Sequence, residues 1–531
     1  MRVGFTTVYS WRPHVQQMYY LAKLLADSGI MIEYMTCSGD LPTCYTRQMR
    51  PNRSQLVECT LCKIGNIAKY SNTKSFKIRG GYGGDVEKPD GLALNKKDGY
   101  LDWGTSSAST IVRFESEAEL EREPFLSLRS DFAAAAEMGY MSARRWIREK
   151  KLDAIFVFNG RIDVTRGICE AAKSLDVTFV SVERSWFGNG VQLLPNETCL
   201  GLQTVHACVQ AWVDVPLTER QAYLGAKAIA ERMLRKNSSE WRSYNVNGKA
   251  AMWPIAEGRW KVLILPGSRN ELHGHPDWEE EWRERTDGYD ALIERFRLQP
   301  HDVVLRAHPN WSEKIGSQTG EKSSASYRLW CEQRGIRFIP GDSDIDTFSL
   351  IKQSDLVVIH ASSAALDAGM LGKRVVCLSG TIYKNADFLE NARSKVELRK
   401  VKELQKSVST LEKRLIISKT MRFCFTMTNR FAQLTEYIRS VNAGEYRYFD
   451  GASSGRIINI IKTGALQADD PVIAETAVGE ERVIDLIDAE DWQTIVDMAT
   501  FTKPGAELEI SRRGVYRHVE KIRELFPNGD R

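Results

Sequence analysis

Apolar segments of this chain that read as strands end repeatedly in residues able to bind an anion or move a proton. The clearest is Leu356–Ile359, which is followed by Ser362 and Ser363 at the start of an expected helix, Ala364–Met370. Serine hydroxyls and the unpaired N–H groups of a helix start attract phosphate. We predict a phosphate contact at these two serines. The alternative is plain capping of the helix, which is compatible with phosphate binding because a capped N-terminus still attracts an anion.

Other strand-like segments of the second half end in the same kinds of residue. Val303–Arg306 is followed by His308, and the proline after this histidine favours an extended backbone that aims the side chain. Capping of a helix or loop is the alternative for His308, and a solvated surface position is the alternative for Arg269. Because the segments belong to one expected sheet, their ends line one edge. The predicted donor-side residues are His308, Ser362, Ser363, Arg269, Ser268 and Gly380.

The first half of the chain offers the groups that acid–base chemistry needs. Glu183 and Asp163 follow two strand-like segments. A carboxylate in a cleft can act as a general base toward an attacking hydroxyl, or as a nucleophile. Glu183 is the first candidate and Asp163 the second, and His14 completes the predicted catalytic group. A structural ion pair with Arg161 or Arg184 is the alternative for Glu183. The predicted acceptor-side residues are Arg161, Asn159 and Arg12.

Four of the ten cysteines lie between positions 37 and 62, in the pattern C-x6-C-x14-C-x2-C. A C-x2-C pair places two thiolates on one tight turn, which suits tetrahedral Zn²⁺, and four thiolates complete a closed structural site or hold an iron–sulfur cluster. Such a site would pin the loop beside the acceptor-side residues, and it would have no open position for catalysis. The alternative is four unligated thiols, or two adventitious pairs. The predicted ligands are Cys37, Cys44, Cys59 and Cys62.

Alternating strands and helices are expected to position these residues. Val3–Thr7, Val15–Asp27 and Met31–Met35 read as strand, helix and strand, and the alternation restarts at Trp260–Leu265. Residues 63–105 are expected to form a long loop or insertion. We predict an α/β protein with two doubly wound, Rossmann-like lobes that face a cleft, followed by a mostly helical C-terminal extension.

The predicted domain boundaries follow from this alternation. The acceptor-side lobe spans 1–245, with a Cys-rich insertion at 37–62, and the nucleotide-binding lobe spans 246–430. The extension spans 431–531, with helices expected at Arg456–Leu466 and Arg512–Leu525.

Composition limits the class of protein. The 531 residues exceed what one hydrophobic core usually holds, and the apolar (43%) and charged (27%) fractions are those of a soluble globular protein. A net charge of +4 is nearly balanced and argues against nucleic acid as a main partner. The chain has no apolar run long enough for a transmembrane helix and no signal-peptide pattern at its start. We therefore expect a cytoplasmic protein, free or peripheral to the inner membrane.

The second lobe resembles the nucleotide-sugar lobe of GT-B glycosyltransferases. The nearest likeness is to bacterial capsule polysaccharide biosynthesis enzymes, the group that includes the Kdo transferases. The motifs are His308-Pro309 after a strand and the segment from Asp355 to Gly380, and the first lobe adds Asn159-Gly-Arg161 and Glu183-Arg184. The resemblance covers residues 1–60, 150–200 and 260–385. It departs at Pro266-Gly-Ser268, where the Kdo transferases carry a Gln-Pro element, and this weakens the case for a Kdo donor.

This resemblance implies a glycosyltransferase that moves a sugar from a UDP-, GDP- or CMP-linked donor to a glycan or lipid-linked glycan in bacterial surface or capsular polysaccharide synthesis. In such enzymes a similar His-Pro element and a similar helix start bind the donor phosphates, and the chemistry requires no cofactor. A sugar-nucleotide 2-epimerase and a polyol-phosphate transferase are alternatives on the same fold. A non-catalytic glycan-binding or scaffold protein is the alternative outside enzymes.

Overall fold

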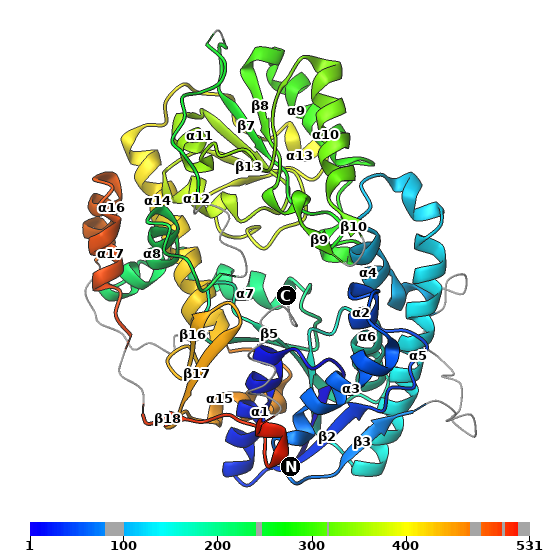
Figure 1. The fold of residues 1–531 in the computed structure, drawn as a ribbon. Coiled ribbons are helices and arrows are strands. Elements are labelled where there is room, and N and C mark those ends of the chain that lie inside the picture. Colours follow the sequence, from blue (N-terminus) through cyan, green and yellow to red (C-terminus); the bar gives the residue numbers. More distant parts are fainter. Residues whose placement is uncertain are drawn as a thin grey trace.

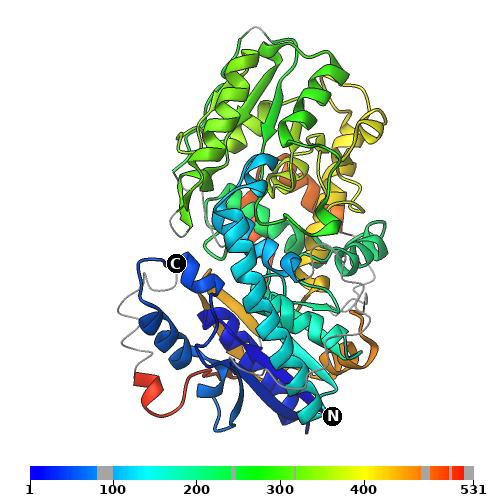
Figure 2. The same ribbon diagram turned by 90° about the vertical axis from the view of Figure 1, so that its right-hand side faces the viewer.

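The protein forms two lobes, each built on its own sheet (Figure 1). The computed structural model describes residues 1–79, 100–240, 247–256, 258–315, 318–467, 479–501 and 505–518. The first lobe holds the N-terminal strands, in the lower half of Figure 1, and the second lobe holds the green and yellow strands above. The lobes still lie one above the other after a turn of 90° (Figure 2). They are therefore stacked in space and do not merely overlap in one view.

The first sheet has a parallel part in the order β3-β2-β1-β4-β5, extended by β6 and β15, which pair antiparallel. The direction of strand order reverses between β1 and β4, as it does in doubly wound sheets. The strands are β1 Arg2–Thr7, β2 Met31–Cys37, β3 Ser75–Ile78, β4 Ala154–Phe158, β5 Thr178–Arg184, β6 Val191–Pro195 and β15 Ala432–Gln433.

Both faces of this sheet are buried. Within β4, Ala154 and Phe156 belong to the hydrophobic core on one face, and Ile155 and Val157 belong to the core on the other. A fully apolar strand of this kind is expected where helices cover both faces of a parallel sheet. The larger helices of this part of the chain are α1 Arg12–Asp27, α4 Leu101–Val112, α5 Phe125–Lys150 and α6 Asp163–Lys173.

The second sheet is parallel throughout and has the order β11-β8-β7-β12-β13-β14. Its strand order reverses between β7 and β12, which align with Leu265 opposite Ile359. The strands are β7 Val262–Leu265, β8 Val303–Arg306, β11 Arg337–Ile339, β12 Leu356–Ile359, β13 Val375–Cys377 and β14 Glu390–Asn391. The helices between them are α9 Arg285–Phe296, α10 Glu321–Arg334, α11 Thr347–Gln353 and α12 Ala364–Met370.

The chain returns to the first lobe after the second sheet is complete. Helix α14, Thr410–Phe425, continues into a π-helix, Thr426–Phe431, and β15 then joins the first sheet beside β6. The residues that follow form a small antiparallel sheet in the order β16-β17-β18, together with further helices. These elements are β16 Ile438–Asn442, β17 Glu445–Phe449, β18 Glu507–Leu508, α15 Gly455–Thr463, α16 Glu480–Asp488 and α17 Trp492–Met498.

The C-terminal residues pack on both earlier parts of the chain. Ile438, Tyr446 and Tyr448 share a hydrophobic core with α1. Helices α16 and α17 lie beside α8, Glu219–Met233, at the left of Figure 1. The extension that we expected to be mostly helical therefore contains a sheet, because its alternating apolar residues find a partner surface on α1.

The prediction of two doubly wound lobes is confirmed by the order of the two sheets. The expected long loop at 63–105 contains an edge strand, β3, and part of α4. Half of the helix expected at Arg512–Leu525 lies outside the described residues, which end at 518. None of the described helices is both long enough and apolar enough to cross a membrane.

Candidate functional site

The carboxyl edges of the two sheets meet where each strand order reverses. Arg161 follows β4 of the first sheet, and its Nη1 donates a hydrogen bond of 3.3 Å to the backbone oxygen of Glu271, which follows β7 of the second sheet. Beside this contact, Ser109 Oγ of α4 donates to the backbone oxygen of Asn270 over 2.8 Å. Ligands of doubly wound sheets bind outside the strand ends at this reversal. The two predicted ligand edges therefore face each other.

Glu183, at the end of β5, is held as a partly exposed carboxylate on the first-lobe edge. Its Oε2 accepts a hydrogen bond of 2.9 Å from Asn159 Nδ2, and its Oε1 accepts one of 3.1 Å from the backbone N–H of Arg184. Asn159 can reach it because its own φ is +63°, which turns the chain sharply after β4. The hydrogen bonds of Glu183 thus come from an amide and a backbone group. The guanidinium of Arg161 does not provide them.

His14 stands next to this carboxylate. Its Nδ1 lies 3.6 Å from Glu183 Oε1, and its ring packs against Phe158 with a centroid separation of 4.2 Å. Burial lowers the pKa of His14 to about 4; Glu183 opposes this shift, and Arg184 adds to it. The imidazole is therefore neutral near pH 7. Glu183, Asn159 and His14, which come from β5, the turn after β4 and α1, therefore form one group.

Asp163, the second candidate base, has a different position. The carboxylate is fully buried at the first turn of α6, where it accepts hydrogen bonds from the Tyr9 hydroxyl and from the backbone N–H of Tyr45. Burial raises its pKa to about 6, although both hydrogen bonds oppose the shift. Its backbone N–H donates to Ser107 Oγ over 2.9 Å. Asp163 therefore ties four segments of the first lobe together and presents no oxygen to the space between the lobes.

Two acceptor-side residues complete the first-lobe edge. Arg12 is the first residue of α1 and is half-buried. Arg161 is also half-buried, and besides Glu271 its Nη1 reaches Ser106 Oγ at 2.8 Å and Thr110 Oγ1 at 3.2 Å. Both hydroxyls belong to α4, which rises from the first lobe toward the second in Figure 2. Arg161 therefore lies at the point where the lobes meet.

His308 caps a short helix, as the structural alternative anticipated. Its Nδ1 accepts the backbone N–H of Asn310 over 3.1 Å at the start of the 3-10 helix Pro309–Ser312. Burial lowers the pKa of His308 to about 4, and Arg113 lowers it further. The neutral ring with Nδ1 as acceptor carries its proton on Nε2. Capping thus fixes the tautomer that offers an N–H donor.

Asn310 links two strand ends of the second sheet. Its Nδ2 donates to Ser268 Oγ over 3.0 Å, which ties the residue after β8 to the residue after β7. Ser268 is half-buried, as are His308 and Asn310. Three polar side chains therefore gather on the second-lobe edge. Two of them, His308 and Ser268, were predicted, and Asn310 was missed although it lies two positions after the histidine.

The serine pair and the glycine of this edge differ in exposure. Ser362 Oγ accepts the backbone N–H of Ala364 over 3.3 Å, whereas Ser363, the N-cap residue of α12, makes no side-chain capping bond and is exposed. A Cβ on Gly380 would lie 2.5 Å from Trp278 Cα, because the chain at Asp277 and Trp278 packs over this glycine. Gly380 is thus covered by the protein's own backbone, and Ser363 is the member of the set with an exposed side chain.

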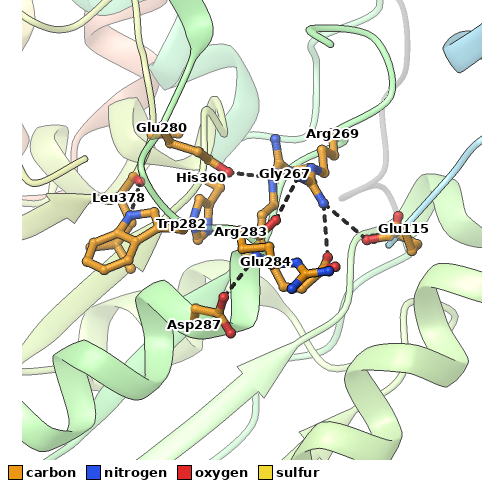
Figure 3. A network of polar contacts seen from close by, with 12 residues as sticks. Glu115, Gly267, Arg269, Glu280, Trp282, Arg283, Glu284, Asp287, His360 and Leu378 are labelled. Carbon is orange, nitrogen blue, oxygen red and sulfur yellow. Dashed lines mark hydrogen bonds and ion pairs between the residues drawn. The ribbon is translucent and has the colours of Figure 1, made fainter. Parts of the chain in front are cut away.

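Arg269 is bonded to acidic side chains and to backbone oxygens, and Figure 3 labels Glu284, Glu115 and Arg283 among these partners. Its Nη1 lies 3.1 Å from Glu284 Oε2, and its Nη2 pairs with Glu117, which comes from the first lobe. The backbone oxygens of Glu115 and Arg283 accept further hydrogen bonds from it. Its side chain is only 11% exposed, so it does not occupy the solvated position that was the alternative. Arg269 joins the two lobes in this structure.

No family model and no curated protein matches the sequence. Among solved structures, the chain is similar to a β-Kdo 2,4-transferase, KpsC of Thermosulfurimonas dismutans, at 13% identity and a TM-score of 0.34, over 59% of this chain and 87% of that one. It is similar to the UDP-GlcNAc 2-epimerase of Methanocaldococcus jannaschii at 11% identity and a TM-score of 0.27, over 75% of this chain and 91% of that one. It is also similar to the spinosyn rhamnosyltransferase SpnG at 12% identity and a TM-score of 0.27, over 81% of this chain and 96% of that one. TM-scores this low establish neither a shared family nor a shared activity.

The four clustered cysteines line one pocket in the first lobe, together with Tyr9 and Lys63. Cys37 Sγ accepts the backbone N–H of Gly39 over 3.2 Å, and Cys62 Sγ donates to the backbone oxygen of Val8 over 3.2 Å. Burial raises the pKa of Cys62 to about 12, so this thiol stays protonated. Among the described residues, no group of three or more His, Cys, Asp or Glu side chains is placed to hold a metal ion.

The predicted ligand set Cys37, Cys44, Cys59 and Cys62 therefore has no preformed four-thiolate site. The physical reason is their placement: they come from the end of β2, the residue before the short helix α2, Tyr45–Met49, and one face of α3, Gln55–Gly65. They are spread around a pocket, and the Cys62 thiol donates its hydrogen to a backbone oxygen.

Some residues of the site carry no signal in the sequence. Glu117 and Glu284 flank Arg269, yet each lies in an unremarkable charged stretch, and Glu117 is 152 positions away from its partner. Glu271 follows β7, but its backbone oxygen meets Arg161 only because the lobes are stacked.

Proposed function

We propose that this protein transfers a glycosyl group from a nucleotide-activated sugar to a glycan acceptor. The observation that supports this most directly is the contact between Arg161 and Glu271, which brings the ligand edges of two doubly wound sheets face to face. A donor on the second-lobe edge would then lie opposite an acceptor on the first. Ser268, Asn310 and His308 face it from one side, and the group around Glu183 faces it from the other.

In the proposed reaction Glu183 is the general base. This carboxylate takes the proton of the attacking hydroxyl, while the Asn159 amide fixes its orientation. The neutral His14 ring shields one side of the carboxylate from water. Holding donor and acceptor at facing edges turns an encounter in solution into a reaction between aligned groups.

The second lobe would stabilise the leaving nucleotide. The Nε2–H group of His308 donates to a phosphate oxygen, and the exposed hydroxyl of Ser363 offers a second contact. Donors fixed in advance where negative charge develops lower the barrier without reorganising. We infer UDP-, GDP- or CMP-linked sugars as donors from the motif resemblance. The same resemblance supports a role in bacterial surface polysaccharide synthesis at the cytoplasmic face of the membrane.

The first test is binding. Thermal unfolding is followed with UDP, GDP, CMP and CDP, and one of them is expected to raise the midpoint. His308→Ala should reduce that rise because it removes the phosphate donor, whereas His301→Ala, at an exposed position outside the site, should leave it unchanged. Failure of all four nucleotides to bind would contradict the proposal and favour a non-catalytic glycan-binding protein.

The second test is turnover. Release of the nucleotide from its sugar in the presence of a glycan acceptor is expected, and Glu183→Gln should slow it by about 10²–10⁴-fold with nucleotide binding preserved, as removal of a general base does. Asp163→Asn serves as a comparison, since Asp163 does not face the space between the lobes. Conversion of the donor without an acceptor would show an epimerase and would contradict transfer.

A further inference from the structure

Arg161 carries a positive charge to the junction between the lobes. It follows Asn159 and Gly160, whose φ values of +63° and +76° turn the chain abruptly after β4. Asn159 Oδ1 accepts the backbone N–H of Arg161 over 3.2 Å, which fixes the turn. The side chain then points away from its own strand and reaches the backbone oxygen of Glu271 in the second lobe. The guanidinium thus has a defined position and is not a mobile surface group.

The partners of this guanidinium are neutral. Its hydrogen bonds of 2.8, 3.2 and 3.3 Å all leave from Nη1 and end on the hydroxyls of Ser106 and Thr110 and on the oxygen of Glu271. The Cys199 thiol also lies beside it, and burial keeps that thiol neutral by raising its pKa to about 12. Within the part of the chain that the structure describes, no carboxylate lies within 4.0 Å of Arg161. A half-buried cation with neutral partners alone favours an anionic ligand.

Arg113 shares the position between the lobes and also donates to backbone oxygens of the second lobe, whereas three other buried arginines behave differently. Arg232 pairs with Glu240 and Asp367 over 2.6 and 3.0 Å. Arg144 and Arg306 donate to neutral oxygens, but those partners belong to their own lobes. Arg161 combines neutral partners with a place between the lobes.

The hydrogen bonds of the guanidinium to oxygen atoms all leave from Nη1, and the Cys199 thiol is a further hydrogen-bond partner. On the side opposite Nη1, the fork formed by Nε–H and Nη2–H has the spacing that matches two oxygens of a phosphate or a carboxylate. Burial lowers the pKa of Arg161, and the charges of Glu271 and Glu183 are among the causes that raise it, although neither carboxylate forms an ion pair with it. An anion bound here would lie next to the Glu183 carboxylate, at the proposed point of transfer.

We propose that Arg161 binds an anionic group of a substrate through this fork. The inference rests on the proposed function and adds a substrate class to it: the group is a phosphate of the activated donor or the carboxylate of an acidic sugar in the acceptor. Both present a pair of oxygens that can accept two parallel N–H bonds from a guanidinium. Arg161 is thus assigned to substrate recognition and not only to the packing of α4.

The experiment measures binding of two probes by calorimetry at low salt: inorganic diphosphate for the donor group and glucuronate for an acidic sugar. The full-length wild type, Arg161→Gln, Arg161→Lys and a control, Arg145→Gln, are compared; Arg145 is an exposed arginine of α5. Loss of a charged hydrogen-bonded pair is expected to weaken one probe by at least about tenfold in Arg161→Gln. Arg161→Lys should recover only part of this, because an ammonium lacks the fork.

The binding results distinguish a donor phosphate from the carboxylate of an acidic acceptor sugar. Weaker diphosphate binding in Arg161→Gln assigns the donor phosphate, and weaker glucuronate binding assigns an acidic acceptor. If wild type binds neither probe, or if Arg161→Gln binds both as well as Arg145→Gln does, the inference is overturned. Circular dichroism and thermal unfolding of each variant exclude a folding defect as the cause.

The same experiment keeps this inference apart from the proposed function. A variant that binds the probes poorly but retains nucleotide binding through His308 leaves the proposed function intact. Probe binding at Arg161 without binding of any nucleotide would support the anion site and contradict transfer from a nucleotide donor.

Discussion

Individual residues of the first-lobe edge owe their properties to burial and not to their own chemistry. Glu183 and Asp163 are both carboxylates that follow strands, but one is partly exposed and held by an amide, while the other is enclosed by Tyr9 and Tyr45. A group that must exchange protons with a ligand has to be reachable. Glu183 meets that condition in this structure, and Asp163 serves the packing of the lobe.

Burial of His14 predicts how stability changes with pH. The unfolded chain takes up a proton on this histidine near the ordinary pKa of 6.5, whereas the folded protein does so only near 4. Between these values the unfolded state binds more protons, so the free energy of unfolding should fall as the pH is lowered from 6.5 toward 4. His14→Gln should reduce that fall by more than about 1 kcal/mol, since each unit of difference in pKa is worth about 1.4 kcal/mol.

Urea unfolding at pH 7 and pH 5 measures this effect. His301→Gln, at an exposed position, is the control and should keep the wild-type difference between the two pH values. If His14→Gln shows the same loss of stability on acidification as the control does, burial of the neutral imidazole is not the cause.

Between elements, a short segment of the first lobe closes onto the second-lobe edge. We call Arg113–Glu119 the latch. Arg113 at the end of α4 donates to the backbone oxygens of Asn310 and Glu313, over 3.1 and 2.5 Å. Glu117 pairs with Arg269, and Lys322 of α10 lies 2.5 Å from Glu119. The latch therefore joins the end of α4 to the residues that follow β7 and β8.

Weakening the latch should loosen the lobes without unfolding them. Glu117→Gln removes one charge from the pair around Arg269, and Arg269→Ala removes the centre of that pair, so its effect should be larger. Hydrogen exchange of the amides at 113–121 is expected to quicken by at least about tenfold in Arg269→Ala, which corresponds to about 1.4 kcal/mol of local opening.

The control for this prediction is the exposed pair Arg145–Glu149 on α5, whose members are also ion-paired but lie within one helix. Glu149→Gln should leave exchange at 113–121 unchanged, because exposed pairs of this kind contribute little. Equal exchange in Arg269→Ala and wild type would show that the latch is held by other contacts.

At the scale of the whole molecule, the C-terminal sheet belongs to the first lobe. Ile438 is fully buried in the core that β16 and β17 share with α1, and Tyr20 of α1 donates to the backbone oxygen of Phe449 over 2.6 Å. Strand β15 adds to this by pairing with β6. The first lobe is thus completed by residues that follow the second lobe in the sequence.

This arrangement predicts that a cavity in the C-terminal sheet destabilises the first lobe. Ile438→Ala is expected to lower the free energy of unfolding by about 2–5 kcal/mol, the range for a large-to-small change in a core. Val441→Ala, on the same strand but 39% exposed, should change it by much less. Urea unfolding followed by tryptophan fluorescence measures both. A transition in Ile438→Ala that matches that of Val441→Ala would show that the sheet is a separate unit.

Much of the fold follows from local pattern. Strands β8 and β12 and helix α12 begin and end where the sequence predicted, because mainly apolar runs and sharp polar boundaries define them. The sequence did not predict two short strands. β3 lies in a stretch that was expected to be a loop, and β15 spans only two residues, since the hydrogen bonds that make them strands come from β2 and β6.

The candidate site also has some features that follow from the sequence and others that follow only from the tertiary structure. The sequence by itself determined which residues follow the strands, and parallel strands necessarily bring those residues to one edge. Tertiary structure alone decided which of them can be reached: Glu183 is partly exposed, Asp163 is enclosed, and Gly380 is covered by Trp278. The periodicity of apolar residues in the sequence indicates which side chains are buried and which backbone conformation a segment adopts. The partner of a charged group, in contrast, is set by how the lobes stack. Arg269 and Glu117 show this, since 152 positions separate them in the chain.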